Sequence, residues 1–125
     1  MRVKNCVLIE PFTCLETDSV VEVAKKLRTT TLRHIFVVDA KNFPKGIISV
    51  IDINNRVVAE NKDANKLKAK DIMTTPVDIV SVGDDTDIIS KDMIKKGRVM
   101  NPVVNENNMM VGIITLNQCL KEDKK

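Results

Sequence analysis

The chain has 125 residues, of which 43% are hydrophobic and 30% are charged, and its formal net charge is +3. This length and composition predict a compact globular chain, and so mild a charge does not by itself indicate nucleic-acid binding. Aromatic residues make up only 2% of the chain, so the stacking side chains on which single-strand binders depend are nearly absent.

The three cysteines, Cys6, Cys14 and Cys119, lie far apart and form no C-x-x-C pair. Neither a structural zinc site nor a disulfide framework is therefore expected, and a reducing cytoplasm fits better. No apolar run approaches the roughly 18 residues of a membrane span. No long apolar segment follows Met1–Asn5, so we expect no signal peptide and no membrane partner.

The first half of the chain predicts a helix, a hairpin and a second helix. Ser19-Val20-Val21-Glu22 has the form of a capping box and apolar residues follow at helical spacing, which predicts a helix from Ser19 to Thr29. Ile35–Val38 and Gly46–Ile51 are short apolar runs typical of strands buried on both faces. The polar turn between them predicts an antiparallel hairpin. The second helix is expected to begin near Asp52 and to carry Ile53, Val57 and Val58.

The same order of elements recurs after the polar stretch Asn61–Lys70. A helix is expected from Asp85 to Lys96, with Gly97 ending it and with Ile88, Ile89 and Met93 facing inward. Strands are expected at Pro102–Val104 and Met110–Thr115, followed by a helix that begins near Asn117.

The two halves are copies of one sequence pattern. Phe36-Val37-Val38-Asp39 recurs as Pro102-Val103-Val104-Asn105, and Gly46-Ile47-Ile48-Ser49 recurs as Gly112-Ile113-Ile114-Thr115, without a gap between the blocks. Such a duplication predicts an α/β fold of two β-α-β-β-α units, residues 1–62 and 63–125, packed with pseudo-two-fold symmetry. The strand residues expected to be buried are Val37, Val38, Ile47, Ile48, Val103, Val104, Ile113 and Ile114.

The repeated blocks, together with Asp71-Ile72-Met73-Thr74 before the second unit, resemble a pair of CBS domains, the family named after cystathionine β-synthase. The resemblance covers nearly the whole chain. It implies two units packed sheet to sheet in a so-called Bateman module, with clefts between them for an adenosine ligand such as AMP, ADP, ATP or an S-adenosyl compound. It also implies a regulatory role, no required cofactor, a homodimer and a protein partner that receives the signal.

The segment from Gly46 to Asp52 resembles the family's ligand motif, in which a glycine is followed by a hydroxyl residue and a carboxylate. A helix N-terminus suits a phosphate, the Ser49 hydroxyl can bind the same group, and the Asp52 carboxylate can accept from ribose hydroxyls. The structural alternative is that Ser49 and Asp52 merely cap the helix. Arg33 and His34 occupy the place where nucleotide-binding relatives carry phosphate-binding residues, or they are an exposed strand start.

The second unit departs from this pattern. Thr115 keeps the hydroxyl, but Gln118 replaces the carboxylate and Val99-Met100 replaces the basic pair. This cleft is therefore expected to bind the same ligand more weakly, to hold a less anionic ligand or to be empty.

The segments before the first strands are expected to complete the clefts. The resemblance implies that Thr74 or Thr75 reaches the cleft of the first unit, and that Pro11-Phe12-Thr13-Cys14 brings Thr13 to the other. Cys14 is expected to be a small buried residue and not a nucleophile.

These features predict a sensor of an adenosine-containing metabolite that is not an enzyme. The sequence shows no nucleophile–base pair, metal-ligand cluster or phosphate-binding loop. Two alternatives stay open: a nucleic-acid-binding protein, and a scaffold with degenerate, empty clefts that acts only through protein–protein contacts.

Overall fold

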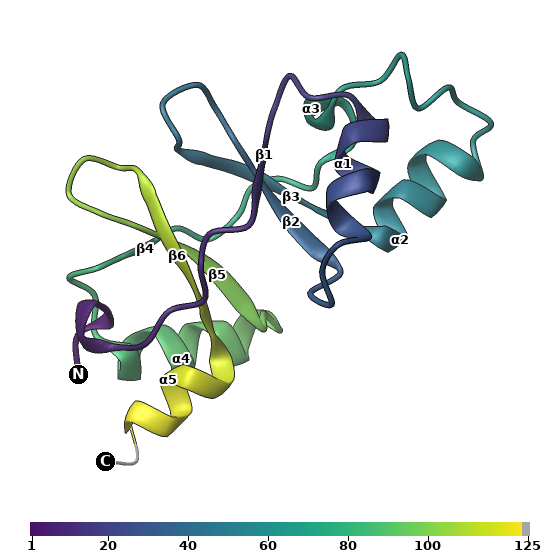
Figure 1. The fold of residues 1–125 in the computed structure, drawn as a ribbon. Coiled ribbons are helices and arrows are strands. Elements are labelled where there is room, and N and C mark those ends of the chain that lie inside the picture. Colours follow the sequence, from purple (N-terminus) through teal and green to yellow (C-terminus); the bar gives the residue numbers. More distant parts are fainter. Residues whose placement is uncertain (124–125) are drawn as a thin grey trace. The chain divides into compact units, whose positions relative to one another are not determined.

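The computed structural model describes residues 1–123, with side chains up to residue 121. Lys124 and Lys125, at the end of the expected second unit, lie outside the described residues. The chain forms two compact bodies: the first body is Phe12–Val77, and the second body combines Met1–Pro11 with Asp78–Lys125. Each body is an α/β unit in which two neighbouring helices cover one face of a three-stranded sheet (Figure 1). No helix of residues 1–123 is long and apolar enough to cross a membrane.

The first body contains a sheet in the order β1-β2-β3, with β1 parallel and β3 antiparallel to β2. Its helix α2 continues without a break into a π-helical segment, η2. In chain order the elements are β1 (Thr13–Leu15), α1 (Val20–Leu27), β2 (His34–Val38), β3 (Pro44–Ser49), α2 (Val50–Ile53), η2 (Asn54–Val58) and α3 (Ala69–Ile72).

The second body repeats this arrangement with the sheet order β4-β5-β6. Its elements are η1 (Val3–Asn5), β4 (Val80–Ser81), α4 (Thr86–Lys96), β5 (Met100–Val104), β6 (Met110–Thr115) and α5 (Leu116–Asp123). Strand β4 is shorter than β1 for a local reason. The Phe36 N–H donates to the Phe12 carbonyl at 3.1 Å, whereas Pro102, its counterpart 66 residues later, has no N–H to donate.

The strand predictions are confirmed in both bodies, with two corrections to the strands and one to a helix. Seven of the eight strand residues expected to be buried are buried, and Ile47 is half-buried. Ile48 points into the core, so the alternation of side chains along the strand turns Ile47 to the other face. The expected strand to Ile51 ends at Ser49, where a helix cap begins α2. Ile88 is wrong as a core residue: it is 69% exposed, since the inward stripe of α4 passes through Ile89 and Met93.

The segments that lead into the two repeats are exchanged between the bodies. The N–H groups of Val3 and Lys4 donate to the carbonyls of Asp84 and Val82, both at 2.9 Å. The counterparts 66 residues later do the same in the first body, where Ala69 donates to Asp18 at 2.8 Å and Lys70 donates to Glu16 at 3.1 Å. Val3 and Ala69 are fully buried. The compact bodies therefore differ from the sequence units 1–62 and 63–125, because each repeat completes its fold with the leading segment of the other.

The motif glycines allow this exchange. A Cβ atom on Gly112 would lie 2.8 Å from the Cβ of Leu8 and 3.2 Å from the Ile9 carbonyl. On Gly46 it would lie 2.7 Å from the Sδ of Met73 and 3.0 Å from the Thr74 carbonyl. In both bodies the leading segment pairs with the residue after the glycine, so an added side chain would crowd that segment.

Candidate functional site

The first body brings the basic pair of the sequence next to the helix N-terminus. The register of the hairpin places His34 opposite Ser49, and the Val50 N–H donates to the Arg33 carbonyl at 3.2 Å. Asp52 lies in the first turn of α2. Arg33, His34, Ser49 and Asp52, predicted as ligand-binding residues from separate motifs, thus form one cluster, which we call the first site.

Ser49 and Asp52 form a reciprocal capping box. The Asp52 N–H donates to the Ser49 hydroxyl at 3.1 Å, and the Ser49 N–H donates to Asp52 Oδ2 at 2.8 Å. The second carboxylate oxygen, Oδ1, lies 3.7 Å from a guanidinium nitrogen of Arg56, and the Asp52 side chain is 16% exposed. The capping interpretation is therefore confirmed for both residues. The cap uses Oδ2 of Asp52, so Oδ1 is the carboxylate oxygen that a ligand would contact.

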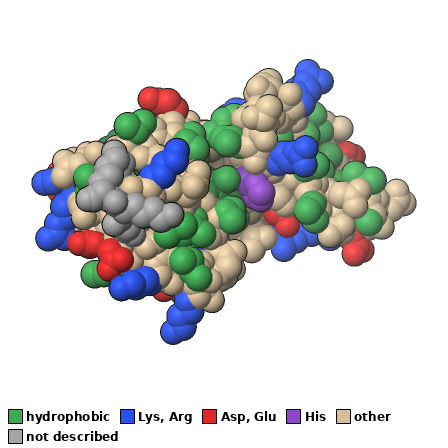
Figure 2. All heavy atoms as spheres, turned by 90° about the horizontal axis from the view of Figure 1, so that it is seen from below, with side chains coloured by type: hydrophobic (Ala, Val, Ile, Leu, Met, Phe, Trp, Pro, Cys, Tyr) green, Lys and Arg blue, Asp and Glu red, His purple; other side chains and the backbone are tan. Residues whose placement is uncertain are grey.

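Arg33 and His34 are held in defined conformations at the start of β2. Arg33 is exposed and has a φ of 61°, in the left-handed region that side chains other than glycine seldom adopt. The Nδ1 atom of His34 is 3.1 Å from the Leu32 carbonyl, which leaves Nε2 to contact a ligand. Figure 2 shows the single histidine at the molecular surface.

The threonines predicted to complete the clefts lie in one body. Thr74 exchanges backbone hydrogen bonds with Ile47, at 2.8 and 3.1 Å, and the exposed Thr75 follows it, joined to Pro76 by a cis peptide. Thr13 lies in β1 of the same body, opposite Phe36. Thr115 and Gln118 belong to the second body, where the leading segment that pairs with β6 does so through Ile9, so the contact of Thr13 with their cleft stays a prediction.

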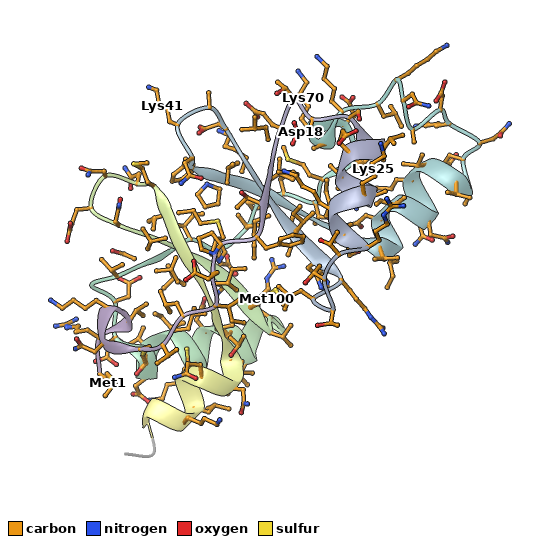
Figure 3. The ribbon with its side chains drawn as sticks, viewed as in Figure 1. Met1, Asp18, Lys25, Lys41, Lys70 and Met100 are labelled. Carbon is orange, nitrogen blue, oxygen red and sulfur yellow. The ribbon has the colours of Figure 1, made fainter. Side chains whose placement is uncertain are left out.

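The second body repeats the backbone arrangement of the first site, but other side chains occupy it. Met100, labelled in Figure 3, lies opposite Thr115, and the Leu116 N–H donates to the Val99 carbonyl at 2.9 Å. The Gln118 N–H donates to the Thr115 hydroxyl at 3.1 Å, as Asp52 does to Ser49. Val99 and Met100 thus hold the positions of the basic pair. Arg98, the nearest cation in sequence, lies 3.3 Å from Asp78.

Two other features bear on the chemistry of the chain: the Cys14 thiol and the placement of possible metal ligands. Cys14 is buried, as expected of a small core residue, and that burial raises the pKa of its thiol to about 12, so the group stays protonated at neutral pH. Within residues 1–123, no group of three or more His, Cys, Asp or Glu side chains is placed to hold a metal ion.

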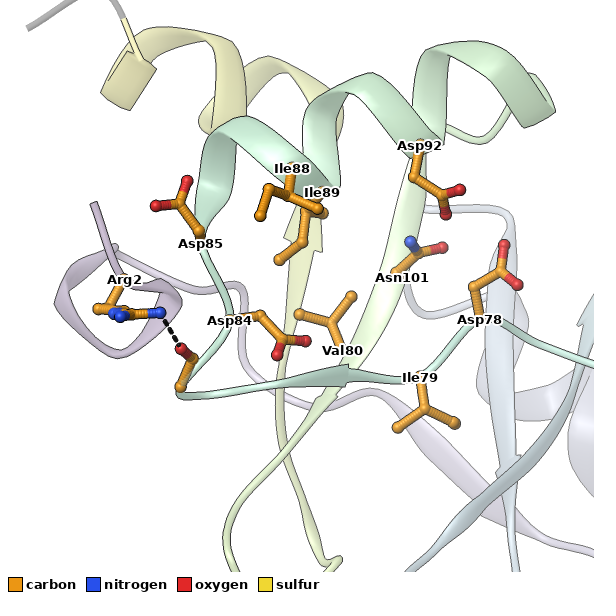
Figure 4. A pocket seen from close by; sticks show the side chains of 11 residues that line it. Arg2, Asp78, Ile79, Val80, Asp84, Asp85, Ile88, Ile89, Asp92 and Asn101 are labelled. Atoms are coloured by element: carbon orange, nitrogen blue, oxygen red, sulfur yellow. Dashed lines mark hydrogen bonds between the residues drawn. The ribbon is translucent and has the colours of Figure 1, made fainter.

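Sequence analysis missed a pocket of about 420 Å³ in the second body, which lies between the β4 edge and α4 (Figure 4). Its wall includes Asp78, Asp92 and Asn101. The first repeat has Phe12, Lys26 and Ile35 at these positions. A residue-by-residue comparison of the two copies would have shown this difference.

The chain is similar to known proteins both in sequence and in fold. The family model described as the CBS domain matches the chain twice, at residues 3–59 and 69–125. An uncharacterized protein of Methanopyrus kandleri is 32% identical over 105 residues, which cover 84% of this chain and 54% of that protein. A homoserine O-acetyltransferase of Methanococcus vannielii is 27% identical over 103 residues, covering 82% of this chain and 21% of the enzyme. The chain thus spans about half or less of the length of these relatives.

Solved structures share the fold at low sequence identity. A candidate acetoin utilization protein from Vibrio cholerae superposes with a TM-score of 0.81 at 23% identity, covering 99% of this chain and 90% of that chain. A CBS domain protein from Pyrobaculum aerophilum, complexed with AMP, superposes with a TM-score of 0.77 at 23% identity. The match covers 94% of this chain and 89% of that chain.

Proposed function

Because the chain belongs to the CBS-domain family, we propose that it is a regulatory module that binds an adenine nucleotide at the first site. The observation that carries this proposal is the placement of Arg33 and His34 against the start of α2. Hydrogen-bond donors of Arg33 and His34 and a helix N-terminus at one spot form a site for a phosphate group. Thr75, in the same body, is proposed to contact the ligand as well.

Each polar group of the first site has a capacity that its structural role leaves unused. The Ser49 hydroxyl accepts a hydrogen bond from the Asp52 N–H and can still donate its proton to a phosphate oxygen. Asp52 uses Oδ2 for the cap, so Oδ1 is the proposed acceptor for ribose hydroxyls, next to Arg56. The guanidinium of Arg33 is exposed and always charged. Capping and ligand binding are thus compatible functions of the same residues.

The AMP complex of the Pyrobaculum protein supports AMP as the first ligand to test, since that protein has the same fold. ADP and ATP share its ribose, base and first phosphate. The frame of Thr115 and Gln118 lacks the basic pair, so we propose that it binds the same nucleotide more weakly or takes an S-adenosyl compound. No resident cofactor is part of this proposal.

The proposed output is a change in protein–protein contacts and not catalysis. Several apolar side chains on the helices are exposed, including Val50 at 50% and Ile51 at 68% in α2 and Ile94 at 58% in α4. Exposed apolar helix faces are suited to association. We propose that the chain forms a homodimer in the cytoplasm and passes the ligand signal to a partner protein.

Calorimetric titration with AMP, ADP, ATP and S-adenosylmethionine tests the proposal. We expect saturable binding of at least one adenine nucleotide, and much weaker binding of ribose 5-phosphate, which lacks the base. Failure of every adenosine compound to bind would favour the scaffold with empty clefts. Binding of an oligonucleotide instead, with a steep dependence on salt, would favour the nucleic-acid alternative.

A further inference from the structure

The place in the first body that corresponds to the pocket of the second body is occupied by a lysine. Lys26 extends from α1, and its ammonium donates to the Thr13 carbonyl at 3.2 Å. The same ammonium lies 3.7 Å from Asp18 Oδ2. The edge of β1 thus carries a cation of the protein itself, held between a strand carbonyl and a carboxylate.

The second body keeps the acceptors but lacks this lysine. Counting 66 residues onward, Ile79 replaces Thr13 and Asp84 replaces Asp18, and both line the pocket. Asp92 stands at the position of Lys26, so no lysine ammonium extends from this point of the helix. The Asp92 carboxylate instead lies 3.1 Å from Lys96. The pocket therefore presents acceptors arranged for an ammonium group without the side chain that supplies one in the first body.

Asn101 gives independent support for a ligand in this pocket. Its counterpart is Ile35, a core residue that is completely buried. Asn101 is only 3% exposed, and no hydrogen bond to its side-chain amide comes from any residue that the structure describes. The amide lies between Asp78 and Asp92 and faces the pocket (Figure 4). The amide is among the side chains that line the pocket, so a ligand there can hydrogen-bond with it in place of water.

We propose that this pocket binds a small aliphatic diamine. One ammonium takes the place of the Lys26 ammonium, against the Asp84 carboxylate and the Ile79 carbonyl. The alkyl chain crosses the apolar wall formed by Val80 and Ile88, and the second ammonium donates to Asp92 and to the Asn101 carbonyl oxygen. The lysine side chain at the corresponding place in the first body has a four-carbon stem, so a chain of about four or five carbons fits best.

The charges around the pocket are compatible with this ligand. The hydrogen bond from the backbone N–H of Asp87 lowers the pKa of Asp85, with smaller contributions from the N-terminal ammonium and Arg2, so this carboxyl is anionic at neutral pH. Arg2 turns its guanidinium to the Gly83 carbonyl at 2.9 Å. Lys96 is shared between Asp78 and Asp92, at 3.3 and 3.1 Å, and these bonds raise its pKa. A ligand ammonium competes with Lys96 at Asp92, while Asp84 has no lysine or arginine partner among the described residues.

Calorimetric titration with 1,5-diaminopentane at low salt tests the proposal, with 1,5-pentanediol as the uncharged control. We expect saturable binding of the diamine with one site per chain and no binding of the diol. Asp92→Lys restores the lysine of the first body and is expected to abolish binding by filling the pocket. Asp84→Asn keeps the oxygen that accepts from the Ser81 N–H but loses the charge, and is expected to weaken binding roughly 10-fold or more.

Asp18→Asn is the matched control, because it alters the equivalent carboxylate at the place that Lys26 already occupies. It should leave diamine binding unchanged, and circular dichroism should show that all three variants are folded. AMP binding at the first site should be the same in Asp92→Lys as in the parent, so the two proposals fail separately. No saturable binding of the diamine, or binding that persists unchanged in folded Asp92→Lys, would overturn the inference.

Discussion

Gly112→Ala is expected to lower the free energy of unfolding by about 1–3 kcal/mol, the usual cost of forcing an extra methyl group into a packed site. The added Cβ would lie 2.8 Å from the Cβ of Leu8, which is fixed to the backbone of the leading segment, and close to the Ile9 carbonyl. Relief requires that this segment move away from β6, to which Ile9 is hydrogen-bonded at 2.9 Å in both directions. Urea unfolding followed by circular dichroism measures the effect.

Gly83→Ala is the matched control, since an added Cβ there meets no atom within 4 Å. Its effect should be a few tenths of a kcal/mol at most, the range expected for an unconstrained surface position. Gly46→Ala should fall between the two, because the nearest atoms belong to the flexible end of Met73. Equal stability of the Gly112 and Gly83 variants would show that the leading segment does not close on β6 as described.

Asp52→Asn is expected to weaken AMP binding at the first site by roughly 10- to 150-fold, which corresponds to the loss of about 1.5–3 kcal/mol for a charged hydrogen-bond partner. The asparagine oxygen can still accept from the Ser49 N–H, so the helix cap is retained while the charge is lost. Calorimetric titration of the folded variant measures the change.

Gln118→Ala is the companion variant at the equivalent position of the second body. Because Val99 and Met100 replace the basic pair there, removal of the amide should change high-affinity AMP binding little. Equal losses in the two variants, or a larger loss at Gln118, would contradict the asymmetry between the sites.

The hairpins could be predicted from sequence because their signals are local and occur twice. Asp39 and Asn105 each accept two loop N–H groups through a side-chain oxygen, and Asn42 and Asn108 have φ values of 65° and 61°. Each turn is thus specified by residues within five positions of one another. Because the sequence is duplicated, the same pattern predicts both hairpins. The first of them positions the predicted cluster around Ser49.

Other features depend on partners distant in sequence. The leading segments bind by backbone hydrogen bonds, such as that from Val3 to Asp84, and backbone groups carry no sequence signal. For this reason the sequence does not show that the strand of Thr13 belongs to the first body while the segment just before it belongs to the second. Asn101 sits within an apolar strand pattern, and its pocket becomes evident only when its counterpart Ile35 is compared with it.

A nuclear magnetic resonance titration of the ¹⁵N-labelled chain with AMP tests the central claim most directly. The backbone amides of Ser49, Val50 and Asp52 should shift first and saturate at the lowest AMP concentration, together with the side chains of Arg33 and His34. Those of Thr115, Leu116 and Gln118 should shift later or not at all. Shifts that begin at Thr115 and Gln118, or a spectrum that AMP leaves unchanged, would contradict a nucleotide sensor built on the first site.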